Sequence, residues 1–151
     1  MWKTASWTLA SAATTAAAAT GTEALAAGSG ANASGNRSTA IGTASVANAT
    51  GSTALGADAS ARANNSTAIG RQTSITAGKG VAIGYTALAS NGANGIAMGY
   101  NAGVSGIDAI AVGSKSRATA TNAIAAGTNA TASGANAIAL GADSKATAAN
   151  S

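Results

Sequence analysis

The sequence predicts an all-β fold, a parallel β-solenoid in which each coil of about 14 residues contributes two short strands. The tetrapeptide pattern x-Ala-aliphatic-Gly, or a weaker copy of it, recurs nine times in register along the 151 residues. Short segments of alternating residues lie between Gly-rich and Asn-rich stretches, which is typical of strands joined by tight turns. A fixed period of this length indicates stacked repeats. The anchor glycines of the pattern are Gly28, Gly42, Gly56, Gly70, Gly84, Gly99, Gly113, Gly127 and Gly141.

The composition argues against a compact globular domain. Alanine supplies 46 residues, whereas Leu, Ile and Val together are fewer than the 20 glycines, so the chain lacks the side-chain volume of an ordinary core. Disorder is also a poor fit, because only 8% of residues are charged and proline is absent. A thin repetitive structure accounts for both facts.

Aligning the copies on the anchor glycine gives columns with a physical meaning. The residue two before the glycine is Ala in all nine copies, and the residue three after is Ala, Ser or Thr. The residue five after is Ala except for Ile75 and Val104. A helix is excluded, because a glycine recurs in every repeat and no apolar stripe has helical spacing. Nine coils stacked about 4.8 Å apart predict a rod on the order of 40 Å long.

We expect the alanine columns to face the inside of the coil, where two sheets must lie close together. Strand alternation then points the aliphatic residues one and three before the glycine outwards, and a continuous exposed ridge of this kind marks an interface. The alternative is that these aliphatic residues fill the coil and the alanines lie outside. We call the two columns the aliphatic ridge. It consists of Ile41, Leu55, Ile69, Ile83, Met98, Val112 and Leu140, beside Val81, Ile96, Ile110, Ile124 and Ile138.

The residue inventory excludes most catalytic chemistry. The chain has no Cys and no His, and its four carboxylates are spread along the sequence. It therefore has no cysteine nucleophile, Ser-His-Asp arrangement, thiolate zinc site or His-ligated metal. We expect no enzyme, no catalytic or metal-binding residue and no cofactor. The net charge of +4 comes from scattered Lys and Arg without a phosphate-tracking cluster, so nucleic acid is not an expected partner.

The repeat units resemble those of a known family. Residues 65–70, 80–84 and 136–141 are similar to the Asn-Ser-Val-Ala-Ile-Gly repeat of the YadA-like head domain of trimeric autotransporter adhesins. The resemblance covers roughly residues 21–149. It implies a left-handed parallel β-roll and a homotrimer of three chains side by side about a three-fold axis. The aliphatic ridge would then form the trimer contact.

The same resemblance implies a function in adhesion. Heads of this family are displayed on the surface of Gram-negative bacteria, as the exposed passenger of an outer-membrane protein. They bind host extracellular matrix such as collagen, or host cells, through an extended face. The alternative is a structural spacer of a surface fibre without its own ligand. Neither a heptad run nor a barrel-like strand is evident, so we expect a head fragment that does not insert into a membrane.

Two segments depart from the regular repeat. Residues 1–20 are expected to be a leader, a linker or a degenerate first coil, followed by the head repeats in 21–149. The step from Gly84 to Gly99 is longer than the others by a single position, and it contains the turn-rich segment 91–95. We interpret it as a one-residue bulge at a corner, or alternatively as a protruding ligand loop.

Tyr85 and Tyr100 are the candidate ligand-binding residues. Each follows an anchor glycine, in consecutive coils, so the two rings should stack about 5 Å apart. Paired aromatic residues are favoured as binding anchors, although corner residues also stack for stability. A loosely basic surface that serves solubility or a ligand is formed by Arg62, Arg71, Lys79, Lys115 and Arg117.

Overall fold

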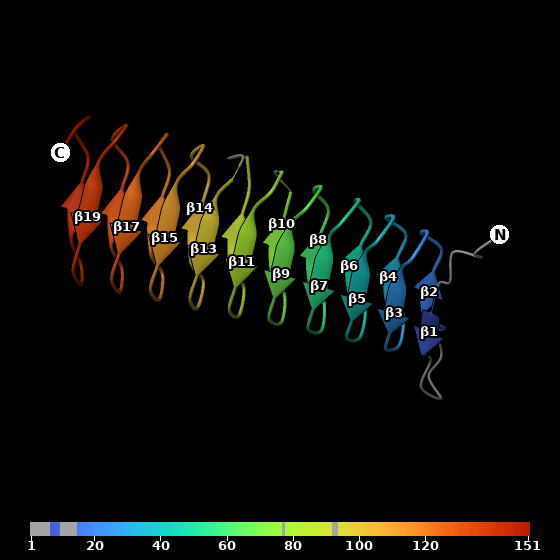
Figure 1. Cartoon of the computed structure of the whole chain (residues 1–151). Coiled ribbons are helices and arrows are strands. Elements are labelled where there is room, and N and C mark those ends of the chain that lie inside the picture. Colours follow the sequence, from blue (N-terminus) through green and yellow to red (C-terminus); the bar gives the residue numbers. More distant parts are fainter. Residues whose placement is uncertain (1–6, 10–14, 77, 92–93) are drawn as a thin grey trace.

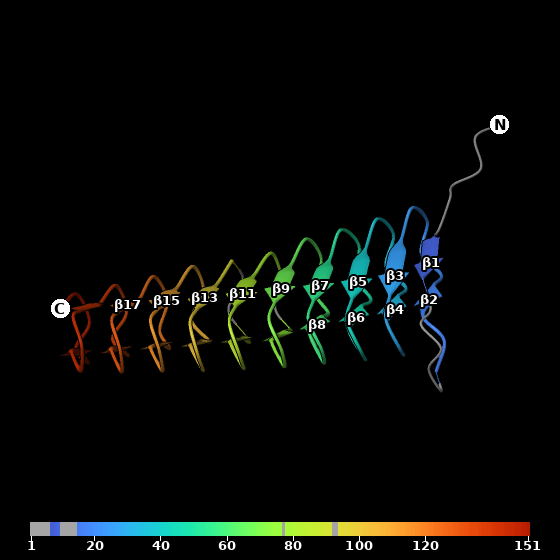
Figure 2. The same cartoon turned by 90° about the horizontal axis from the view of Figure 1, so that it is seen from below.

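The molecule is a two-sheet solenoid whose coils follow one another along a single axis (Figures 1 and 2). The computed structural model describes residues 7–9, 15–76, 78–91 and 94–151. Within these ranges every regular element is a strand, and the strands form two sheets of ten. The predicted parallel β-solenoid is thereby confirmed.

The first sheet is built from three-residue strands, and all but the first of them contain the x-Ala-aliphatic pattern or its weaker copy. Along the axis these are β1 (Trp7–Leu9), β3 (Leu25–Ala27), β5 (Thr39–Ile41), β7 (Thr53–Leu55), β9 (Thr67–Ile69), β11 (Val81–Ile83), β13 (Ile96–Met98), β15 (Ile110–Val112), β17 (Ile124–Ala126) and β19 (Ile138–Leu140).

The second sheet is built from two-residue strands, and all but the first of them begin four residues after an anchor glycine. They are β2 (Ala18–Ala19), β4 (Asn32–Ala33), β6 (Val46–Ala47), β8 (Ser60–Ala61), β10 (Ser74–Ile75), β12 (Leu88–Ala89), β14 (Gly103–Val104), β16 (Arg117–Ala118), β18 (Thr131–Ala132) and β20 (Lys145–Ala146).

Each strand pairs in parallel with its copy in the next coil, so equivalent residues lie side by side. Ala40 pairs with Ala54 and Ala54 pairs with Ala68. Across the longer step Val81 pairs with Ile96, so the extra residue is absorbed in the corner between β12 and β13. Residues 92 and 93 of that corner lie outside the described residues. In the segment 1–20, β1 pairs with β3 and β2 pairs with β4.

The interior of the coil is filled by small side chains, as the column pattern predicts. The alanines two before the anchor glycines are at most 1% exposed, and Ala33, Ala47 and Ala61 opposite them are fully buried. Only Ile75 and Val104 are larger residues of this interior column. The aliphatic ridge lies outside the coil, so the alternative arrangement with the alanines on the surface is wrong.

The anchor glycine is required by the first turn of each coil. Its φ lies between +110° and +137° in all nine copies, a region that L side chains rarely adopt. The chain also passes close to the next coil, because a Cβ on Gly84 would lie 2.5 Å from the carbonyl oxygen of Gly99. Both constraints explain why this column tolerates no side chain.

Two further positions per coil adopt the left-handed conformation, the second and the ninth after the anchor glycine; in the longer coil after Gly84 these residues are Thr86, Asn91 and Asn94. Eleven of the eighteen non-glycine residues with positive φ are Asn or Asp, which tolerate this region best. Buried hydroxyls close the turns: Ser38 Oγ donates to the carbonyl of Gly35 at 2.6 Å, and Ser45 Oγ to that of Gly42 at 2.9 Å. The corners thus satisfy their buried polar groups without large side chains.

The anchor glycine provides a test of the coil geometry. Gly84→Ala should lower the free energy of unfolding by about 2 kcal/mol or more, because it combines an unfavourable φ with a clash against the next coil. Gly78→Ala is the matched control, because a Cβ at Gly78 meets no atom within 4 Å. Urea unfolding followed by circular dichroism measures both. Equal midpoints for the two variants would contradict the geometry described.

Candidate functional site

The outer face of the first sheet is an uncharged apolar strip. The aliphatic ridge runs along it, and none of its neighbours in the two outward columns of β3 to β19 is ionisable. Leu55, Met98 and Val112 are about 40% exposed, and Leu140 is 78% exposed. Ile41, Ile69 and Ile83 are half-buried against their neighbours. A strip of this kind is suited to pack against another apolar surface.

The structure brings Tyr85 and Tyr100 together at the first turn of consecutive coils. Their ring centroids are 5.7 Å apart with an angle of 11° between the planes, which is a stacked arrangement. Both side chains are exposed. The predicted proximity of the two rings is confirmed, and it follows from the fixed register of the coils.

Arg71 extends this stack by one coil. Its guanidinium carbon lies 5.6 Å from the centroid of the Tyr85 ring, within the range of a cation–π interaction. We call Arg71, Tyr85 and Tyr100 the tyrosine stack. Sequence reasoning placed Arg71 only in a diffuse basic surface. The available signal was its position directly after an anchor glycine, the same column as the two tyrosines.

The acidic side chains of the described residues lie apart from one another in the turns of the coils. Among the residues that the structure describes, no three His, Cys, Asp or Glu side chains gather where they could hold a metal ion. Within the same ranges no helix is long and apolar enough to cross a membrane. The candidate functional features are therefore the exposed faces and corners of the coils.

The comparisons with known proteins agree with this architecture. The family model described as the YadA head domain repeat (2 copies) matches residues 19–45, 47–73, 76–102, 105–131 and 132–151. The chain belongs to the YadA head family. The match confirms the resemblance seen in the repeat units. The family is one of adhesins, which are a non-enzymatic class. No curated protein sequence matches the chain.

A solved structure supports the same assignment for this YadA-type head. The collagen-binding domain of the Yersinia adhesin YadA is 26% identical to the chain. The alignment covers 96% of this chain and 77% of that domain, with a TM-score of 0.64. The adhesin class is thus supported by sequence and by fold.

The tyrosine stack should contribute to stability at its corner. Replacing Tyr85 and Tyr100 by Ser, which occupies this position as Ser29 and Ser114 in two other coils, should lower the free energy of unfolding by about 1 to 2 kcal/mol, because ring stacking and the cation–π contact are lost. The double Phe variant keeps the stacked rings and serves as the control. Chemical unfolding midpoints compare the three proteins, and a Ser variant as stable as the wild type would show that the stack is not stabilising.

Proposed function

We propose that this chain is the head of a homotrimeric adhesin on the bacterial surface, attaching the cell to a host extracellular matrix protein of the collagen type or to the host cell surface. The observation that carries the proposal is the match of YadA head repeats over residues 19–151, with only short gaps. The similarity to a collagen-binding domain supports the choice of ligand class. As a passenger exposed by an outer-membrane protein, the head would present its coils to large extended ligands.

The aliphatic ridge is the proposed trimer contact. Burial of one such side chain contributes about 1.5 to 3 kcal/mol, and the ridge repeats the contribution along the axis. The absence of ionisable residues from these two columns means that no charge has to be desolvated on association. Three parallel chains could therefore join along their first sheets and leave their second sheets facing outwards.

The tyrosine stack is the proposed contact for the protein ligand. Tyrosine supplies a large apolar face together with a hydroxyl group, and Arg supplies a planar donor. Such residues dominate the binding energy of many protein interfaces. The exposure of Tyr85 and Tyr100, 41% and 50%, leaves ring surface available for a partner.

The proposed trimer can be tested by introducing charged residues on the aliphatic ridge. The double variant Ile69→Asp with Ile83→Asp should dissociate it, because two carboxylates per chain would have to be buried in an apolar contact. Light scattering should give three times the 13.9 kDa chain mass for the wild type and one chain mass for the variant.

A matched control places the same two charges on the opposite face, at Ser74→Asp with Leu88→Asp, which are also paired in register. This control should remain trimeric. A monomeric wild type at micromolar concentration, or an unchanged mass of the ridge variant, would refute the proposed contact.

Attachment is tested by binding of the purified trimer to immobilised collagen, fibronectin and cultured cells. We expect binding to at least one of them, and the double variant Tyr85→Ser with Tyr100→Ser should weaken it by about tenfold or more, as expected for a dominant contact. The double Phe variant should bind more strongly than the Ser variant. Absence of binding to all three would favour the structural spacer. If the Ser variant bound as tightly as the wild type, the ligand contact would lie outside the tyrosine stack.

A further inference from the structure

The charged residues of the described coils are distributed unevenly over the surface, and one face carries an excess of positive charge. Within the described coils the turns carry four cations and four carboxylates, which cancel. These turn residues are Arg37, Arg71, Lys79 and Lys115, with Glu23, Asp58, Asp108 and Asp143.

The remaining charges of the described coils all lie on the outer face of the second sheet. Arg62, Arg117 and Lys145 are exposed there, four or six residues after an anchor glycine, and no carboxylate occupies these columns. We call this outer face of the second sheet the cationic face. It therefore carries the whole net charge of the described coils, +3, while the outer face of the first sheet carries none.

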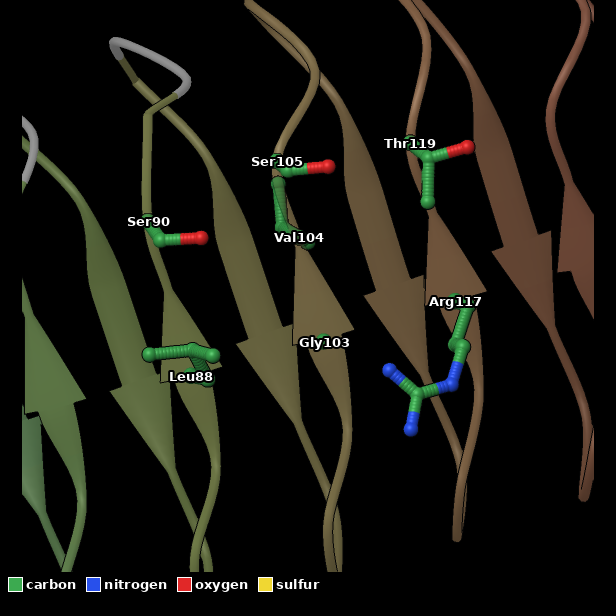
Figure 3. Close-up of a pocket in the computed structure, with 7 residues that line it drawn as sticks. All are labelled: Leu88, Ser90, Gly103, Val104, Ser105, Arg117 and Thr119. Atoms are coloured by element: carbon green, nitrogen blue, oxygen red, sulfur yellow. The ribbon is translucent and has the colours of Figure 1, made fainter.

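The cationic face contains an open hollow of about 140 Å³ (Figure 3). It exists because Gly103 stands in the outward column, paired in register between Leu88 on one side and Arg117 on the other. The Arg117 side chain reaches back over this gap, and one of its terminal nitrogens lies 3.4 Å from the position of a Cβ on Gly103. Because Gly103 has no side chain, the guanidinium of Arg117 borders an open space.

The rim of the hollow is lined by hydroxyl groups. Ser90, Ser105 and Thr119 line it, six residues after successive anchor glycines, and Figure 3 shows them in one row above Leu88, Gly103 and Arg117. The site thus combines a planar cation, a row of neutral hydrogen-bonding groups and the exposed aliphatic side chain of Leu88, and the buried Val104 also lines it. It is smaller than the roughly 300 to 1,000 Å³ of a pocket that encloses a whole ligand, so it suits one unit of a longer chain.

We propose that the cationic face binds a linear acidic polysaccharide, with one sugar ring in the hollow. The carboxylate or sulfate of that ring pairs with the Arg117 guanidinium, which matches such groups with two parallel hydrogen bonds. The sugar hydroxyls bond to Ser90, Ser105 and Thr119, and the apolar side of the ring packs on Leu88.

The other cations extend the site along the axis. Lys145 lies two coils beyond Arg117, about 10 Å away at the usual strand spacing, and Arg62 lies four coils before it, about 19 Å away. A chain with repeated anionic groups can reach all three, whereas a single sugar cannot. If the ridge forms the trimer, this face remains open to solvent.

Other polyanions fit the face less well. A bound peptide strand would need an unpaired sheet edge, and β12, β14 and β16 are paired on both sides. Nucleic acid binding relies on dense positive charge and on aromatic stacking of unpaired bases, and the outward columns of the second sheet from β4 to β20 contain no aromatic residue.

The test measures binding of heparin fragments to the purified full chain by calorimetry at 50 and 200 mM salt. Arg117→Gln should weaken binding at least fivefold. Lys115→Gln is the matched control, because it removes the same charge two residues away in a turn, and it should change the affinity less than twofold. Gly103→Leu fills the hollow without changing charge, and should also weaken binding at least fivefold.

Three results would overturn the proposal. The first is no heparin binding at 50 mM salt, and the second is an equal loss for Arg117→Gln and Lys115→Gln, which would indicate unspecific attraction. The third is equally tight binding of polyglutamate, which would indicate an acidic peptide as the ligand. Collagen binding is measured separately, so heparin binding without collagen binding would overturn the matrix-protein ligand alone.

Discussion

The rest of the structure depends on how closely the two sheets of each coil approach one another. The strands are two or three residues long and each coil is complete between one anchor glycine and the next, so the space between the sheets holds one layer of methyl groups from each side. Ala82 and Ala89 fill that space completely, and both are fully buried. A core of this kind makes few contacts per side chain. Hydrogen bonds between successive coils add to this packing, and among the described residues they include the corners as well as the strands.

This thin interior dictates the composition of the surface. Among the described residues Ile75 and Val104 are the large aliphatic residues inside the coil, and the other large aliphatic residues lie on its outside. Strand alternation gathers most of them on the first sheet, in the two columns beside the interior alanines. The equivalent columns of the second sheet hold mostly polar and cationic residues, with Val46 and Leu88 as their large aliphatic members. Packing inside the coil thus produces two faces of opposite character, one suited to association between chains and one suited to a polar ligand.

The sequence predicted the features that repeat and missed those that occur once. The period, the interior alanine columns and the stacking of Tyr85 on Tyr100 follow from register alone. Arg71 and Gly103 lie in outward columns whose residue type varies from coil to coil. The role of one residue in such a column is not evident from the sequence until its neighbours in space are known. The left-handed conformation at Ala44 and Lys79 was equally invisible, because neither residue type favours it and the stacked coils impose it.

The stacking of equivalent residues in successive coils also limits the shape of ligand that the head can bind. Neighbouring coils place the same column about 4.8 Å apart, so a feature on one coil is extended only by residues of the adjoining coils. The interior alanine columns keep the backbone similar in every coil. The residue types in the outward columns can therefore differ from coil to coil without altering the backbone. Arg71, Tyr85 and Tyr100 form one such run, and Leu88, Gly103 and Arg117 form another in overlapping coils. A partner that contacts all three residues of either run has to extend along the axis of the solenoid. This favours fibrous proteins and linear polysaccharides over compact ligands.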